Sequence, residues 1–176
     1  MKKFLNILIV VIAFSFSSCE KDDICAGTTP TTPRLIVEFY DFSNPAVLKS
    51  IDNLSAIGND QETGVIFNEL AQDSTKYLIS ATSVALPLDI SQDMTTYKLR
   101  VKANSTNPAV YNDDIIKIDY AREQIYVSRA CGYKTIFYLN NVTRTPITND
   151  SEWIRNITFE PSTIDNEQDI HVKIYW

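Results

Sequence analysis

The sequence predicts an all-β protein whose single domain is an antiparallel β-sandwich of the immunoglobulin-like or a related type. After residue 33, apolar and polar residues alternate in short stretches, which is the period of a half-buried strand. Turn-forming residues separate these stretches about every ten residues. The same part of the sequence has no long stretch with convincing helical spacing. About eight to ten short strands follow from this pattern, and a sandwich is a common arrangement for them.

The first half of the domain contains one clear strand and one ambiguous segment. Residues 35–40 alternate strictly and therefore predict a strand. Residues 46–57 allow two interpretations, either a helix with one apolar face or two short strands. Further short apolar runs lie at 65–67, 77–79 and 81–88. Pro87 ends the last run or places it at a sheet edge, because proline cannot donate to a strand ladder.

The second half carries the strongest strand signals. Residues 97–101 predict a half-buried strand with a basic outer face. The clearest predicted hairpin pairs residues 116–120 with 125–127 around a turn at Arg122-Glu123-Gln124. The remaining predicted strands are 135–139, 157–159 and 172–176, with a loop at 140–151. Alternation in the last strand places His171 on the solvent face.

The N-terminal residues divide the chain into three parts. Residues 1–18 have a basic start and a short apolar run, which is typical of an export signal peptide. The apolar run from Phe4 to Phe16 is shorter than the roughly 20 residues that a membrane-spanning helix needs. Residues 19–33 are small, polar and punctuated by proline, so they predict a linker, and residues 34–176 form the predicted domain.

The end of the signal peptide resembles the lipobox of bacterial lipoproteins. The matching residues are Phe16-Ser17-Ser18-Cys19, with Phe16 where leucine is most usual. The resemblance implies cleavage before Cys19 and acyl chains on that cysteine, so that the membrane is a partner through the N-terminal lipid. The alternative is an ordinary secretory signal cut nearby, since both kinds of signal place small residues before the cleavage site.

Charged residues follow the lipobox directly. Lys21-Asp22-Asp23 resembles the export signal of surface lipoproteins in the Bacteroidota. This resemblance implies that the anchored chain is displayed on the outer face of the outer membrane. The alternative is a solvated tether on a lipoprotein that faces the periplasm.

Three cysteines are present, and two remain if Cys19 is lipidated. Cys25 and Cys131 then predict a disulfide, because the cell envelope is oxidising. Two buried thiols, or a reactive Cys131, are the alternatives. In addition, Ala130-Cys131-Gly132, the segment His171–Tyr175 and the Cys-x5-Cys start resemble an uncharacterised family of small Bacteroidota lipoproteins. That resemblance covers nearly the whole chain and implies no activity.

Charge and residue types exclude several functions. Without residues 1–18 the chain keeps 14 basic and 22 acidic side chains, a net charge of −8, which argues against nucleic acid and against docking on anionic lipid. A Cys131–His171 nucleophile pair is conceivable, but a disulfide at Cys131 and a solvent-facing His171 account for both residues. Neither a cofactor nor catalytic residues are predicted.

Acidic clusters and aromatic residues supply the remaining candidates. Asp113-Asp114 and the run Asp165-x-Glu167-x-Asp169 are oxygen clusters of a kind that can hold Ca²⁺. The second has the spacing that begins a calcium loop but lacks the glycine of its sharp turn. The alternative is turn residues in an acidic protein, and no metal site is predicted. Four aromatic residues are candidate ligand contacts or covers for sheet edges: Tyr126, Tyr138, Trp153 and Tyr175.

These observations lead to one functional hypothesis and two alternatives. The hypothesis is a lipid-anchored, non-enzymatic binding or scaffolding module on the outer membrane, with an envelope protein or a glycan as its partner. The first alternative is a hydrolase that acts on glycans, or an accessory subunit. The second is a structural lipoprotein that faces the periplasm.

Overall fold

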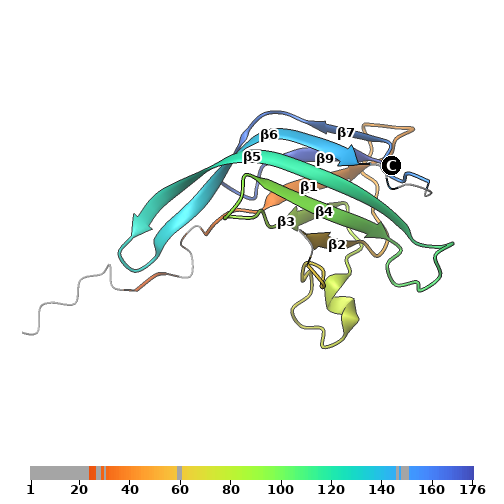
Figure 1. Cartoon of the computed structure of the whole chain (residues 1–176), viewed down its shortest axis with the longest axis horizontal. Helices are drawn as coiled ribbons and strands as arrows, with labels where there is room; N and C mark the ends of the chain where they lie inside the picture. The colour runs from red at the N-terminus through yellow and green to blue at the C-terminus, as the bar shows by residue number, and fades with distance from the viewer. Residues whose placement is uncertain (1–23, 27–28, 30, 59–60, 146, 148–150) are drawn as a thin grey trace, which may run out of the picture.

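The computed structural model describes residues 24–26, 29, 31–58, 61–145, 147 and 151–176. Two β-sheets pack together into a sandwich, from which a long hairpin projects (Figure 1). The first sheet has the order β3 (Ser83–Leu86), β1 (Leu35–Tyr40), β9 (Val172–Tyr175), β7 (Asn156–Phe159). The second has the order β2 (Ser55–Gly58), β4 (Met94–Val101), β5 (Asn112–Ser128), β6 (Gly132–Thr145), β8 (Thr163–Ile164). The predicted all-β sandwich is confirmed.

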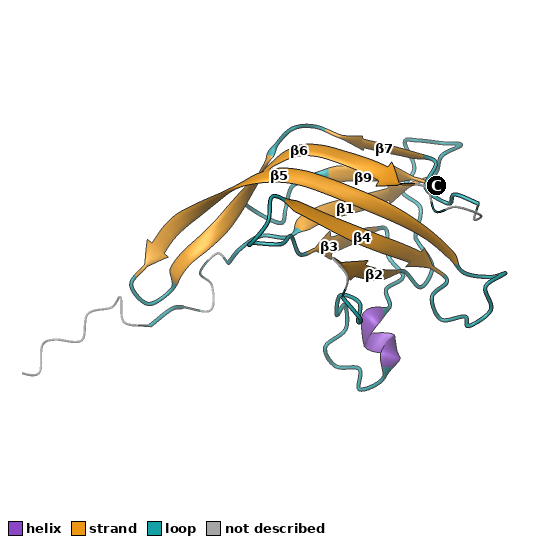
Figure 2. Ribbon diagram, in the orientation of Figure 1, coloured by secondary structure: helices purple, strands orange, loops and turns teal. Residues whose placement is uncertain are grey.

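Strand pairing is antiparallel throughout the described ladders except at one place. β1 and β9 run parallel, with Val37 opposite Val172. This pair brings the first and last strands of the domain side by side in the middle of the first sheet (Figure 2). The C-terminal strand is therefore hydrogen-bonded on both sides, by β1 and by β7.

The core lies between the two sheets and follows the predicted alternation. Leu35, Val37 and Phe39 on β1 are fully buried, and Ile174 on β9 is as well. Tyr120 and Phe137 meet edge to face across the β5–β6 ladder, with ring centroids 5.2 Å apart. Burying a large apolar side chain stabilises the fold by about 1.5–3 kcal/mol, so this layer supplies most of the driving force for folding.

The ambiguous segment 46–57 forms extended structure rather than a helix. Leu48 forms an isolated bridge with Tyr40, Leu54 forms one with Ile79, and β2 follows directly. Ile51 and Leu54 are fully buried whereas Leu48 is 46% exposed, so the apolar residues do not form the single buried face that a helix needs, and β2 pairs with β4 instead.

The predicted hairpin around residues 122–124 is wrong. β5 continues through these residues, where Arg122, Glu123 and Gln124 pair with β6, and the chain turns only at 129–131. The charged side chains have partners that keep them in a strand. The Arg122 Nε donates to Asp93 Oδ1 at 2.6 Å, and Glu123 accepts a hydrogen bond from the Tyr138 hydroxyl. The predicted loop at 140–151 is also wrong in part, because β6 extends to Thr145.

The outer halves of β5 and β6 form the arm, which we define as residues 121–138. It extends beyond the sandwich, and the N-terminal segment that the structure describes lies beside its tip (Figure 1). A short 3-10 helix, η2 (Ser74–Tyr77), lies in the connection between β2 and β3. Within the described residues, no helix has the length and apolar character needed to cross a bilayer.

Candidate functional site

The first functional feature is the attachment of the N-terminal segment to the tip of the arm. The Sγ atoms of Cys25 and Cys131 lie at disulfide distance, 2.03 Å apart, with the two Cα atoms separated by 4.9 Å. Cys131 occupies the turn between β5 and β6, where its backbone N–H donates to Ser128 Oγ. The Thr135 N–H also donates to Thr32 Oγ1 at 3.0 Å, so the linker contacts the arm at a second place.

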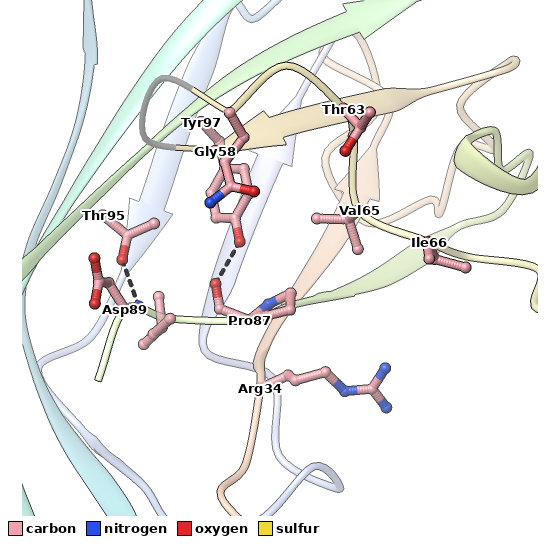
Figure 3. Close-up of a pocket in the computed structure, with 12 residues that line it drawn as sticks. Arg34, Gly58, Thr63, Val65, Ile66, Pro87, Asp89, Thr95 and Tyr97 are labelled. Carbon is pink, nitrogen blue, oxygen red and sulfur yellow. Dashed lines mark hydrogen bonds between the residues drawn. The ribbon is translucent and has the colours of Figure 1, made fainter. Parts of the chain in front are cut away.

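The second feature is a groove along the open side of the sandwich, where the two sheets come to their edges (Figure 3). Its volume is about 490 Å³. Gly58 and Tyr97 from the second sheet face Pro87 and Leu88, which follow β3 in the first sheet. Val65 and the half-exposed Ile66 come from the segment after β2 and form one wall (Figure 3). These residues place apolar side chains on both sides of the groove, and the remaining lining includes the polar or charged residues Arg34, Gln61, Thr63, Asp89 and Thr95.

Hydrogen bonds fix the polar groups at the floor of this groove. The Tyr97 hydroxyl donates to the Pro87 carbonyl, and Thr95 Oγ1 accepts from the Asp89 N–H at 2.9 Å. The Tyr120 hydroxyl lies 2.8 Å from the Asp89 carbonyl oxygen and 2.6 Å from Thr95 Oγ1. Burial raises the pKa of Tyr97 far above its ordinary value and also raises that of Tyr120. The floor is consequently uncharged and has its hydroxyl groups already partnered.

The charged groups that line the groove, Arg34 and Asp89, have partners within the protein. Arg34 donates from Nε to Glu167 Oε1 at 2.8 Å and from its terminal amino group to Oε2 at 2.6 Å. This hydrogen bonding lowers the pKa of Glu167. The Asp89 carboxylate accepts from the N–H and the hydroxyl of Ser91. Among the described lining residues, Asp89 alone carries a carboxylate.

The four predicted aromatic contacts do not form one site. Tyr126 and Tyr138 lie on the arm, and Tyr175 packs against Tyr40 on the first sheet with ring centroids 5.6 Å apart. Trp153 was predicted in or near a loop, but it is only 8% exposed and donates from Nε1 to the Leu99 carbonyl at 3.3 Å. It belongs to the core, so the prediction of a ligand contact at Trp153 is wrong.

The sequence reasoning missed one aromatic residue. Tyr133 is 66% exposed and lies directly opposite Tyr126 in the β5–β6 ladder. The two rings meet edge to face with centroids 5.4 Å apart. The pair was missed because the predicted turn at 122–124 gave the wrong register for these strands.

In the structure, the residues of each predicted acidic cluster have different surroundings and different partners. Asp113 points to the outer side of β5 and pairs with the Arg100 Nε at 2.6 Å, while Asp114 is buried. Asp165 and Asp169 both accept from the Asn166 side chain, and Glu167 binds Arg34. The described residues contain no group of three or more His, Cys, Asp or Glu side chains that could hold a metal ion.

His171 lies in a different place from the one predicted. It is 3% exposed rather than on a solvent face, and its Nδ1 accepts the backbone N–H of Ile36 at 3.0 Å. The loop before β9 and the neighbouring strand β1 enclose a position that alternation alone assigns to solvent. Cys131 is bonded to Cys25, so the conceivable Cys131–His171 nucleophile pair is not formed.

The burial of His171 predicts a pH dependence of stability. Burial lowers its pKa, although Asp169 and Asp165 oppose the shift. The unfolded chain takes up the proton near pH 6.5, so stability is fully present above this value and is lost as the pH falls toward the folded pKa. We expect His171→Gln to lack this pH-dependent loss of stability, because glutamine does not titrate. The free energy of unfolding of both proteins is measured by urea unfolding from about pH 7.5 to 5.5. Parallel curves for the two proteins would show that His171 does not titrate on unfolding.

These features define a class: a small β-sandwich protein with a cysteine bridge from its N-terminal segment to a projecting arm, and a groove between its sheets. Residues 53–176 match the model of DUF6452, a family of unknown function. The chain belongs to this family. No curated protein and no solved structure gives a significant match. The matched region begins just before β2, so β1 lies outside it although β1 pairs with β3 and β9.

Proposed function

We propose that the chain is a lipid-anchored cell-envelope protein that holds a non-enzymatic binding or scaffolding module on the outer face of the outer membrane. The observation that carries this proposal is the Cys25–Cys131 bridge, which attaches the domain six residues after Cys19. Cys19 and the residues Lys21, Asp22 and Asp23 lie outside the described residues. An acylated Cys19 explains why the chain is fastened so close to that cysteine.

The anchor has a simple physical consequence. Each buried methylene contributes about 0.8 kcal/mol, and two or more acyl chains hold a protein on a membrane stably. Six residue steps of extended chain reach at most about 20 Å. The bridge therefore keeps the tip of the arm within that distance of the bilayer surface, and the domain does not swing freely on a long linker.

The groove supports binding rather than catalysis. The hydroxyl groups of Tyr97, Thr95 and Tyr120 are already partnered, and Asp89 is the one carboxylate among the described lining residues. Such a surface suits an uncharged or apolar segment of an envelope protein better than the transition state of glycan hydrolysis, which needs two carboxylates. The ring of Tyr97 is buried, so the groove offers no exposed face of that ring for stacking on a sugar.

The anchor is tested by growing cells with a clickable palmitate analogue and purifying the protein. We expect the label on the wild type, because acylation occurs at Cys19, and none on Cys19→Ser. The matched control is Cys25→Ser, which removes the neighbouring cysteine and keeps the label. An unlabelled wild type, or a label that follows Cys25, contradicts the proposal.

A further inference from the structure

The tip of the arm exposes two large aromatic rings. Tyr126 is 55% exposed and Tyr133 is 66% exposed, and they lie directly opposite each other on one face of the hairpin. The pair sits two residues from the end of the β5–β6 ladder, well away from the packed sandwich (Figure 1). Exposed tyrosines at the extremity of a projecting hairpin add nothing to the core.

The charge of the tip differs from that of the rest of the protein. Between Gln124 and Asn140 the sequence has no acidic residue and two basic ones, Arg129 and Lys134, whereas the whole chain has a net charge of −6. Arg129 is exposed in the turn itself. Arginine and lysine near a membrane surface are each attracted to anionic lipid by about 1 kcal/mol, so the tip fits phosphate groups although the protein as a whole is acidic.

The bridge places this tip next to the proposed anchor. Cys131 lies in the turn between Arg129 and Tyr133, and its partner Cys25 follows Cys19 by six residues. The reach of that segment is at most about 20 Å. Tyrosine side chains concentrate at membrane–water interfaces, where the ring enters the apolar side and the hydroxyl stays hydrated.

We propose that the tip of the arm, namely Tyr126, Arg129, Tyr133 and Lys134, lies in the lipid headgroup region of the leaflet that holds the anchor. This inference rests on the proposed lipid anchor at Cys19. The tyrosine pair enters the interface, and the two cations contact lipid phosphates. The long strand β5, which spans about 55 Å over its 17 residues, then rises from the bilayer. The loop between β4 and β5 lies at the opposite end of the molecule from the tip (Figure 1), so in this arrangement it is the part most distant from the membrane.

The test uses the full lipidated protein in vesicles of phosphatidylethanolamine and phosphatidylglycerol whose acyl chains carry bromine, which quenches tryptophan fluorescence at short range. Tyr133→Trp places an indole at the tip, and Val110→Trp places one in the loop at the other end of β5. Both positions are exposed, at 66% and 45%, so either substitution leaves the core unchanged. Trp153 and Trp176 give a background that the wild type records.

We expect the added emission of Tyr133→Trp to be quenched and that of Val110→Trp to be unaffected. Flotation of the vesicles and the acyl mass of the N-terminal peptide are measured on the same samples. If the protein floats and neither indole is quenched, the tip contacts something other than lipid, such as a protein, and the inference is wrong while the anchor stands. Quenching of both indoles means that the domain lies flat, which also overturns it. Protein that neither floats nor carries acyl mass overturns the anchor and the inference together.

Discussion

Cys25→Ser is expected to lower the free energy of unfolding by roughly 4–5 kcal/mol, because the bridge closes a loop of 106 residues and restricts the unfolded chain. The bond also joins the linker to the arm. The hydrogen bond from the Thr135 N–H to Thr32 Oγ1 is a second contact between these two segments. The loss is measured by urea unfolding of the purified variant beside the wild type under oxidising conditions.

The two cysteines provide their own control. Cys131→Ser and the double variant should lose the same amount as Cys25→Ser, because each removes the same single bond. Wild type under a reducing agent should approach the same stability. A double variant that loses the sum of the two single losses would show that the thiols act separately and that no bond joins them.

Asp114→Ala is the second substitution with a large expected effect. Asp114 is 1% exposed, and its Oδ2 accepts the backbone N–H groups of Trp153 at 3.0 Å and Ile154 at 2.7 Å. Burial raises the pKa of this carboxyl group, while the two hydrogen bonds and Arg144 oppose the shift. Removing the carboxylate leaves two buried donors without that acceptor, so we expect a loss of roughly 2–5 kcal/mol in chemical denaturation.

The preceding residue is a matched control for Asp114. Asp113 has the same chemistry but lies on the outer side of β5, where it pairs with Arg100. Asp113→Ala should cost less than Asp114→Ala, because the Arg100 side chain that it leaves behind is 29% exposed and can be solvated by water. Equal losses for the two alanine variants would contradict the role assigned to the inward carboxylate.

Much of the fold could be predicted because its strands are half buried. Alternation identified β1, β4 and β9, whose inner residues form the core. The turn at 122–124 was mistaken because charged residues in a strand interior favour a turn locally. Their partners, Asp93 for Arg122 and Tyr138 for Glu123, come from other strands or connections, which a reading of neighbouring residues does not include.

The surroundings of His171 and Asp114 were harder to predict, because their hydrogen-bond partners are distant in the sequence. The donor that meets His171 belongs to Ile36, 135 residues earlier, and the donors that meet Asp114 follow it by about 40. One signal was present in the sequence: Asp114 has the same parity as the buried Ile116 and Ile118, which predicts that it points inward. No comparable signal predicts the groove, because its walls come from separate segments of both sheets.

The most direct measurement of the central proposal is protease digestion of intact cells. Wild type is compared with a variant in which Lys21, Asp22 and Asp23 are changed to alanine, and a periplasmic protein serves as the control for intact membranes. We expect the protease to cut the wild type and to spare the variant, because the proposal assigns to the charged segment the role of directing the chain to the outer face. Protection of the wild type in intact cells, with cutting only after lysis, would contradict display on the surface.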